Sequence, residues 1–153
     1  MTQHADVVTV ERLIPALPER IFALLADPAR HREIDGSGTV RDLKAAPAEP
    51  LGLGSKFGMN MKAGLAYSME STVIEFEPNQ RIAWQTRPSG MFANFGGGRI
   101  WRYELEPTNG GTLVRESWDI SQEKIKVLVR PIAKRTRAAM EKTLERIETV
   151  VTH

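Results

Sequence analysis

Hydrophobic and polar residues alternate through most of the chain in short segments, and this period of two is typical of half-buried β-strands. In residues 55–62, for example, Phe57, Met59 and Met61 share one face, and the residues between them are polar, charged or glycine. Short clusters of glycine, proline and asparagine separate the segments, as turns between strands require. Strands are therefore predicted over residues 7–14, 39–45, 55–62, 66–76, 81–87, 99–106 and 112–120.

Two other regions carry apolar residues every three to four positions, a pattern that indicates helices. Short helices are predicted over residues 18–26 and 28–34, each of which begins with a proline. After a lead-in over residues 122–129, a main helix of about 20 residues, about 30 Å long, is predicted to have Pro131 in its first turn. Its apolar stripe consists of Ile132, Thr136, Met140, Leu144, Ile147 and Val151.

The order of these elements predicts the fold class. One strand is followed by two short helices, then by consecutive strands and one long helix. Strands joined by hairpins form an antiparallel sheet, and Asn109-Gly110 is a typical hairpin turn. With one substantial helix, the economical packing is a curved sheet of about six to seven strands wrapped around that helix. We therefore expect an α+β fold, with residues 1–153 as a single domain.

Composition narrows the classes of function. The chain has no cysteine, which excludes disulfides, thiolate zinc sites and cysteine nucleophiles. Its histidines, His4, His31 and His153, are scattered, so no metal or other cofactor is expected. The start of the chain lacks the pattern of a signal peptide, and no stretch approaches the ~18 apolar residues of a membrane helix. We expect a cytoplasmic protein, either a monomer or a homodimer.

Charge is distributed unevenly although the net charge is only +2, too small to indicate a nucleic-acid partner. Six basic residues with no acid between them occupy the segment 124–137. They are Lys124, Lys126, Arg130, Lys134, Arg135 and Arg137. One interpretation is a solvated helix face. The other is a dock for an anionic partner, which would be a phosphate-bearing ligand, a carrier protein or a membrane surface.

Several segments, taken in order, resemble START-like (SRPBCC) proteins of the polyketide cyclase/dehydrase and lipid transport branch. They are PERIFALLADP (18–28), HREIDGSGTV (31–40), LGSKFGMNM (53–61), VIEFEPNQRIAW (73–84), WRYELEP (101–107), GGTLVRE (110–116) and MEKTLERI (140–147). The similar proteins are mostly bacterial. The resemblance implies a helix-grip fold with an internal cavity for a small apolar ligand that is aromatic, polyketide-like or lipid-like. It leaves open whether the chain is a binding protein or a cyclase/dehydratase-type enzyme.

The side chains expected to face such a cavity are large and apolar, with a few polar groups among them. Ligand cavities of this kind typically enclose ~300–1,000 Å³, and methionine adapts to irregular apolar ligands. The alternative is that the same residues fill a solid core. The candidate ligand-binding residues are Phe57, Met59, Met61, Tyr67, Met69, Trp84, Phe92, Trp101, Tyr103, Glu116, Trp118, Thr136 and Met140, and Ser71 and Ile132 also face inward by their spacing.

Glu116 is the first candidate for chemistry. It alternates with Val114 and Trp118, so it faces inward if they do. A buried carboxyl group has a raised pKa and can act as a general acid or base. Its expected partner is then Tyr67, Tyr103 or His31. The alternatives are a salt bridge to Arg99 or Arg102, or a position near the open end of the strand.

Two further features carry polar or aromatic groups that a ligand could contact. His31, Asp35 and Ser37 lie within one short segment, which we interpret as a turn rather than as a nucleophile triad. His31 or Asp35 remains a candidate for contact with a ligand. The glycine-rich loop over residues 88–98 carries Met91, Phe92 and Phe95. It is either a flap over the mouth of the cavity or a plain connection.

Overall fold

The computed structural model describes residues 6–37, 40–45, 50–63, 65–89 and 97–153. Of residues 40–45, 61–63 and 65–67 it describes the backbone. Phe92, with Met91 and Phe95, lies outside the described residues, so the flap stays a prediction.

Seven antiparallel strands form one sheet, with the order β1-β7-β6-β5-β4-β3-β2. The strands are β1 (Val7–Ile14), β2 (Val40–Ala45), β3 (Lys56–Ala63), β4 (Leu65–Glu77), β5 (Arg81–Pro88), β6 (Arg99–Thr108) and β7 (Gly111–Asp119). Strands β2 to β7 pair with their neighbours in the chain, while β1 crosses over to pair with β7. The predicted antiparallel sheet and α+β class are confirmed.

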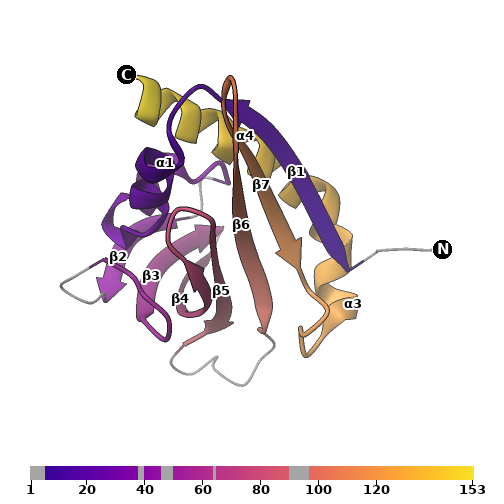
Figure 1. Ribbon diagram of the computed structural model, residues 1–153. Helices are drawn as coiled ribbons and strands as arrows, with labels where there is room; N and C mark the ends of the chain where they lie inside the picture. The colour runs from indigo at the N-terminus through magenta and orange to yellow at the C-terminus, as the bar shows by residue number, and fades with distance from the viewer. Residues whose placement is uncertain (1–5, 38–39, 46–49, 64, 90–96) are drawn as a thin grey trace.

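The helices lie against one face of the sheet, which curves around them (Figure 1). They are α1 (Pro18–Leu25), η1 (Pro28–Arg30), α2 (His31–Ile34), α3 (Lys126–Val129), η3 (Arg130–Ile132) and α4 (Ala133–Thr152). Helix α4 packs along β1 and β7, and α2 packs against α4. Among the described residues, none of the helices combines the length and the apolar character needed to cross a bilayer.

Pro131 lies just before the long helix, in the 3-10 turn η3, and α4 itself begins at Ala133. The predicted break between a short lead-in and a 20-residue main helix is therefore confirmed, while the position predicted for Pro131, in the first turn of the main helix, is wrong by one short turn. The inward position predicted for Ile132 is wrong, because this side chain is 37% exposed. Ile132 lies in the 3-10 turn η3, where the residues repeat about every 3.0 rather than every 3.6 positions, so the α-helical spacing behind the prediction does not apply to it.

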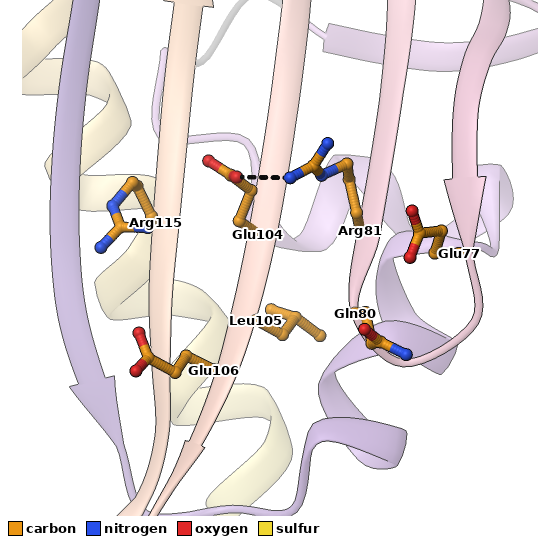
Figure 2. Close-up of a pocket in the computed structure, with 7 residues that line it drawn as sticks. All are labelled: Glu77, Gln80, Arg81, Glu104, Leu105, Glu106 and Arg115. Atoms are coloured by element: carbon orange, nitrogen blue, oxygen red, sulfur yellow. Dashed lines mark hydrogen bonds and ion pairs between the residues drawn. The ribbon is translucent and has the colours of Figure 1, made fainter.

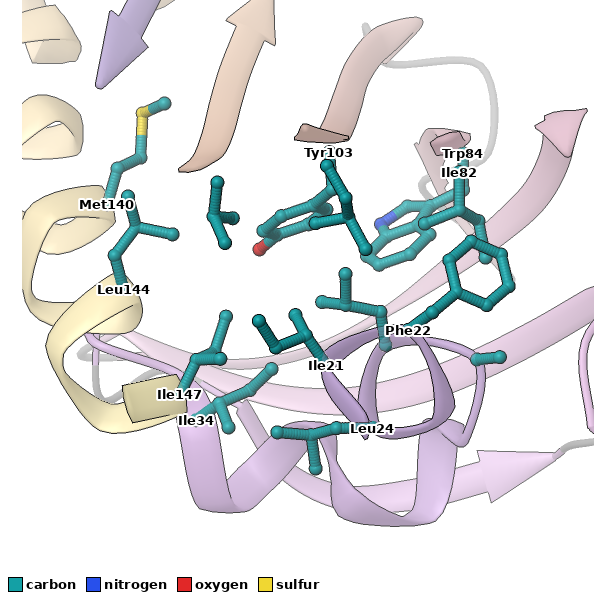
Figure 3. Close-up of a cluster of buried hydrophobic side chains, with 14 of the residues drawn as sticks. Ile21, Phe22, Leu24, Ile34, Ile82, Trp84, Tyr103, Met140, Leu144 and Ile147 are labelled. Carbon is teal, nitrogen blue, oxygen red and sulfur yellow. The ribbon is translucent and has the colours of Figure 1, made fainter. Parts of the chain in front are cut away.

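The core lies between the inner face of the sheet and the helices (Figure 3). Helix α4 contributes the row Met140, Leu144, Ile147 and Val151, each of which is 5% exposed or less. Burial of each of these large apolar side chains stabilises the fold by about 1.5–3 kcal/mol. The predicted helical stripe is thus confirmed from Met140 to Val151, where it joins the core.

Candidate functional site

Glu116 lies on the inner face of β7, the strand next to the edge strand β1, and is 2% exposed. It stands directly opposite Tyr103, because β6 and β7 pair these two residues in register. The Tyr103 hydroxyl donates a hydrogen bond of 2.9 Å to Oε2 of Glu116. The same hydroxyl points toward α4 in Figure 3. The structure therefore brings together two of the residues that the sequence proposed as an acid/base pair.

The alternative of an arginine partner for Glu116 is wrong. Arg99 pairs with Glu123 at 2.8 Å, and Arg102 binds Glu75 through two hydrogen bonds. Arg102 alternates with Tyr103 and projects from the outer face of the sheet, so its side chain is on the other side of the backbone from Glu116.

Burial raises the pKa of Glu116 to about 8. The hydrogen bond from Tyr103 acts in the opposite direction and lowers this pKa, while the negative charge of Asp35 raises it further. Burial and the neighbouring Glu116 also raise the pKa of Tyr103 well above its ordinary value. At neutral pH the pair is therefore a carboxylic acid next to a phenol, without a net charge.

Two buried polar atoms of β7 have no hydrogen-bond partner among the described residues. They are Oε1 of Glu116 and Nε1 of Trp118. Both residues face the interior from the same strand, two positions apart, and Trp118 is 1% exposed. An unpaired buried polar group costs about 1–3 kcal/mol, so native proteins rarely retain one without a function or a bound molecule.

A row of rings connects this pair with α2. The His31 ring stacks on Trp84, with ring centroids 5.0 Å apart, and Phe57 meets both rings edge-on. The ring of Trp84 lies 5.7 Å from that of Tyr103. His31 Nε2 donates to the carbonyl oxygen of Leu25 at 2.8 Å. Burial lowers the pKa of His31, so this ring is neutral at neutral pH.

Asp35 lies in a turn, as the sequence indicated. Its carboxylate accepts hydrogen bonds from the backbone nitrogen of Ser37 at 3.0 Å and from the hydroxyl of Ser37 at 2.6 Å. The adjacent Gly36 lets this turn approach α4 closely, since a Cβ atom there would lie 2.2 Å from the carbonyl oxygen of Ala139. The Gly36 nitrogen also donates to Thr143 Oγ1 at 2.8 Å. The turn thereby brings the charge of Asp35 close enough to raise the pKa of Glu116.

The remaining candidate residues differ in how deeply their side chains are buried. Phe57, Met59, Met69, Trp84 and Met140 are buried on the inner side, and Ser71 is buried and bonded to Thr86. Trp101 and Thr136 are half-buried. The side chains of Met61 and Tyr67, like Phe92, lie outside the described residues. Thr143, which is buried in α4 beside Leu144, was not among the predicted site residues. Its hydroxyl group next to the apolar stripe was the feature of the sequence that could have indicated it.

A shallow hollow of about 190 Å³ lies on the outer face of the sheet, with α4 behind it (Figure 2). Its lining is mostly charged, and the charges pair across the strands. Arg81 binds Glu104 at 3.1 Å, and Arg115 binds Glu11 at 2.6 Å. Among the described residues, the lining of this hollow includes none of the candidate residues. The internal cavity therefore stays a prediction, and buried apolar side chains pack together between the sheet and the helices (Figure 3).

The sequence of this chain is similar to one family of known proteins. A family model described as polyketide cyclase/dehydrase and lipid transport matches residues 5–152. The uncharacterized protein Rv0088 of Mycobacterium tuberculosis is 42% identical over 113 residues. That alignment covers 72% of this chain and 45% of Rv0088, so the chain spans less than half of the length of this relative.

Solved structures share the fold at low sequence identity. Protein CV1439 from Chromobacterium violaceum superposes with a TM-score of 0.72 at 18% identity, over 95% of this chain and 96% of that protein. DynU16, a protein of the dynemicin biosynthetic locus, superposes with a TM-score of 0.64 at 16% identity, over 94% of this chain and 46% of DynU16. At this level of identity the likeness supports the fold, while the site must be argued from its own residues.

Proposed function

Because the chain belongs to the polyketide cyclase/dehydrase and lipid transport family, we propose that it binds a small, largely apolar molecule between the sheet and α4. The ligand is aromatic, polyketide-like or lipid-like, and it carries at least one oxygen that accepts hydrogen bonds. The observation that carries this proposal is the pair of buried, unpartnered atoms, Glu116 Oε1 and Trp118 Nε1.

The chemistry of these two atoms defines the polar end of the ligand. The indole Nε1 of Trp118 is a hydrogen-bond donor only. With a pKa of about 8, Glu116 is protonated at neutral pH, and its Oε2 already accepts from Tyr103. A proton on Oε1 makes that atom a second donor. Two donors on one strand favour a carbonyl or hydroxyl oxygen on the ligand, since such an oxygen satisfies both without introducing a charge.

The space for the apolar part of the ligand is filled by adaptable side chains. Met59 and Met69 are direct cross-strand partners on the inner face of β3 and β4, and Met140 is the buried residue of α4 nearest its start. Methionine has several rotatable bonds and changes its conformation at low energetic cost. A ligand that displaces these side chains gains the apolar contacts that they leave.

A second function, a cyclase/dehydratase-type enzyme acting on such a ligand, is favoured by the raised pKa of Glu116 and its hydrogen bond with Tyr103. In a dehydration, Glu116 would donate its proton to a leaving hydroxyl group, which departs as water. The resulting carboxylate would then take a proton from the neighbouring carbon, which regenerates the acid and leaves a double bond in the product.

Native mass spectrometry of the protein purified from its own host tests ligand binding directly, with identification of any molecule released on denaturation. We expect an apolar molecule that carries oxygen. A defined probe pair, 2-naphthol and naphthalene, isolates the polar contact, because the two probes differ by one hydroxyl group. The wild-type protein should bind 2-naphthol more tightly, and Trp118→Phe should reduce this preference. A protein that retains no molecule and binds neither probe contradicts the proposal.

Glu116→Gln separates the two functions. Glutamine keeps a donor of similar shape but transfers no proton at neutral pH. For a binding protein, the variant should retain most of the affinity for the identified ligand. For an enzyme, it should retain binding and lose turnover. Glu106→Gln, at an exposed position on β6, is the matched control and should change neither property. Turnover that survives in Glu116→Gln rules out the enzymatic role of this residue.

A further inference from the structure

The segment that leads into α4 exposes an unusual amount of apolar surface. Val127 is 71% exposed and Leu128 70%, and Ile125 and Ile132 are 38% and 37% exposed. Val127 and Leu128 lie in α3, Ile125 directly precedes it, and Ile132 ends the following turn η3, so the four residues are close together in the chain. We call these four residues the α3 patch. Figure 1 places α3 at the end of the molecule away from the C-terminus.

Basic side chains surround the α3 patch. Lys124, Lys134 and Arg135 are exposed and flank it in the chain on both sides. The segment 124–137 contains six cations and no acid. Among the described residues, the ion pairs of this segment go to Asp6, which binds Lys126 at 3.4 Å and Arg130 at 3.1 Å. The region therefore retains a strong positive charge next to its apolar side chains.

The segment is held in place rather than loosely attached. Val129 is buried between the exposed positions. Just before the patch, the buried carboxylate of Glu123 accepts a hydrogen bond from the Gly97 nitrogen at 3.0 Å and pairs with Arg99. These contacts fix the segment against the start of β6. The exposure of Val127 and Leu128 is thus imposed by the anchored neighbours on either side of them.

We propose that the α3 patch docks this protein on the surface of a bilayer that contains anionic lipids. Apolar side chains that enter the interface, with cations beside them, are the features by which an amphipathic segment binds such a surface. A second copy of the chain is a poor occupant, because it would bring the same excess of positive charge against itself. A bilayer surface satisfies both the apolar and the cationic part of the patch.

Sedimentation with vesicles tests this proposal. The wild-type protein should bind vesicles of phosphatidylcholine mixed with phosphatidylglycerol, and should bind vesicles of phosphatidylcholine alone much more weakly. The double variant Val127→Ser/Leu128→Ser should bind the mixed vesicles at least ~10-fold more weakly, because it removes the apolar contacts. Lys134→Gln/Arg135→Gln should weaken binding by roughly 25-fold, at about fivefold for each cation, and added salt should act in the same direction.

The matched control is Leu17→Ser/Leu53→Ser. These leucines are 63% and 71% exposed and lie outside the basic segment, so the control removes similar apolar surface without changing vesicle binding. Circular dichroism of each variant verifies that the fold is retained. The proposal is overturned if the control loses as much vesicle binding as Val127→Ser/Leu128→Ser does. It is also overturned if the wild-type protein binds vesicles equally with and without phosphatidylglycerol.

Other occupants of the patch give different results. If the patch joins two copies of the chain, Val127→Ser/Leu128→Ser shifts the oligomeric state in analytical ultracentrifugation while vesicles have no effect, and the proposal is overturned. If the partner is instead an acidic protein, the wild-type protein should bind vesicles with phosphatidylglycerol no more strongly than Lys134→Gln/Arg135→Gln does. This result also overturns the proposal. Vesicle binding is measured without the internal ligand, so it is independent of the proposed function.

Discussion

Replacing Glu116 by glutamine should change how the stability of this protein depends on pH. Glu116 has a pKa of about 8 in the folded protein, against an ordinary value of 4.5. The folded state therefore keeps a proton that the unfolded state releases. The stability associated with this proton is fully present below pH 4.5 and is lost as the pH rises toward about 8. Glutamine does not titrate, so the variant lacks this loss.

The titration of His31 changes the stability in the opposite direction to that of Glu116. It therefore limits the pH range in which the effect of Glu116 can be measured alone. Burial lowers the pKa of His31 from its ordinary value of 6.5. Its contribution to stability is present above pH 6.5 and is lost as the pH falls below that value. Between pH 4.5 and pH 6.5 the two residues oppose each other, and above pH 6.5 the loss due to Glu116 dominates.

The expected magnitude follows from the two pKa values of Glu116. One proton retained by the folded state changes the free energy of unfolding by about 1.4 kcal/mol per pH unit. Since the folded state also begins to release the proton near pH 8, the loss between pH 6.5 and pH 8 is on the order of 2 kcal/mol. The total loss from the acid side to above pH 8 is on the order of 5 kcal/mol.

Urea unfolding followed by tryptophan fluorescence measures this free energy, because Trp84 and Trp118 are buried in the core. Unfolding curves of the wild-type protein and Glu116→Gln are compared at intervals from about pH 6.5 to about pH 9. The free energy of unfolding should fall with pH for the wild-type protein and stay nearly level for the variant. Above pH 8, Glu116→Gln should therefore be the more stable protein.

The control for this experiment is Glu106→Gln, which removes an exposed carboxyl group from β6 and should leave the pH dependence of the wild-type protein unchanged. Parallel curves for the wild-type protein and Glu116→Gln would refute the reasoning. They would mean that Glu116 is ionised in the folded protein at neutral pH, and its role as a hydrogen-bond donor to a ligand would fail with it.

Two further predictions concern neighbours of Glu116. Tyr103→Phe removes the hydrogen bond that lowers the pKa of Glu116, so the fall in stability should extend to higher pH than in the wild-type protein; an unchanged range would mean that this bond has no effect on the carboxyl group. Gly36→Ala places a Cβ atom 2.2 Å from the backbone oxygen of Ala139 and should lower the free energy of unfolding by about 2 kcal/mol or more in urea. Gly52→Ala, whose Cβ atom would meet nothing within 4 Å, is its control, and equal effects of the two substitutions would contradict the close approach of the turn to α4.

The site was only partly predictable from the sequence. Alternation along β7 indicated that Glu116 shares a face with Val114 and Trp118, and its burial agrees with this. Its partner could not be selected, because Tyr67, Tyr103, His31, Arg99 and Arg102 were all compatible with an unknown register. The pairing of β6 with β7 decided the question by placing Tyr103 opposite Glu116. A register shifted by one residue would have brought an outward-facing side chain to that position.

The sequence by itself determined the elements of this protein, since periods of two and of about 3.6 residues are local properties of strands and helices. It therefore predicted the strands, the long C-terminal helix and its buried stripe. Only the tertiary structure decided what depends on contacts between distant segments. The raised pKa of Glu116, the approach of Gly36 to α4 and the exposure of Val127 and Leu128 all belong to this second group. Each results from residues that are far apart in the chain and are brought together by the fold, and no local pattern encodes such contacts.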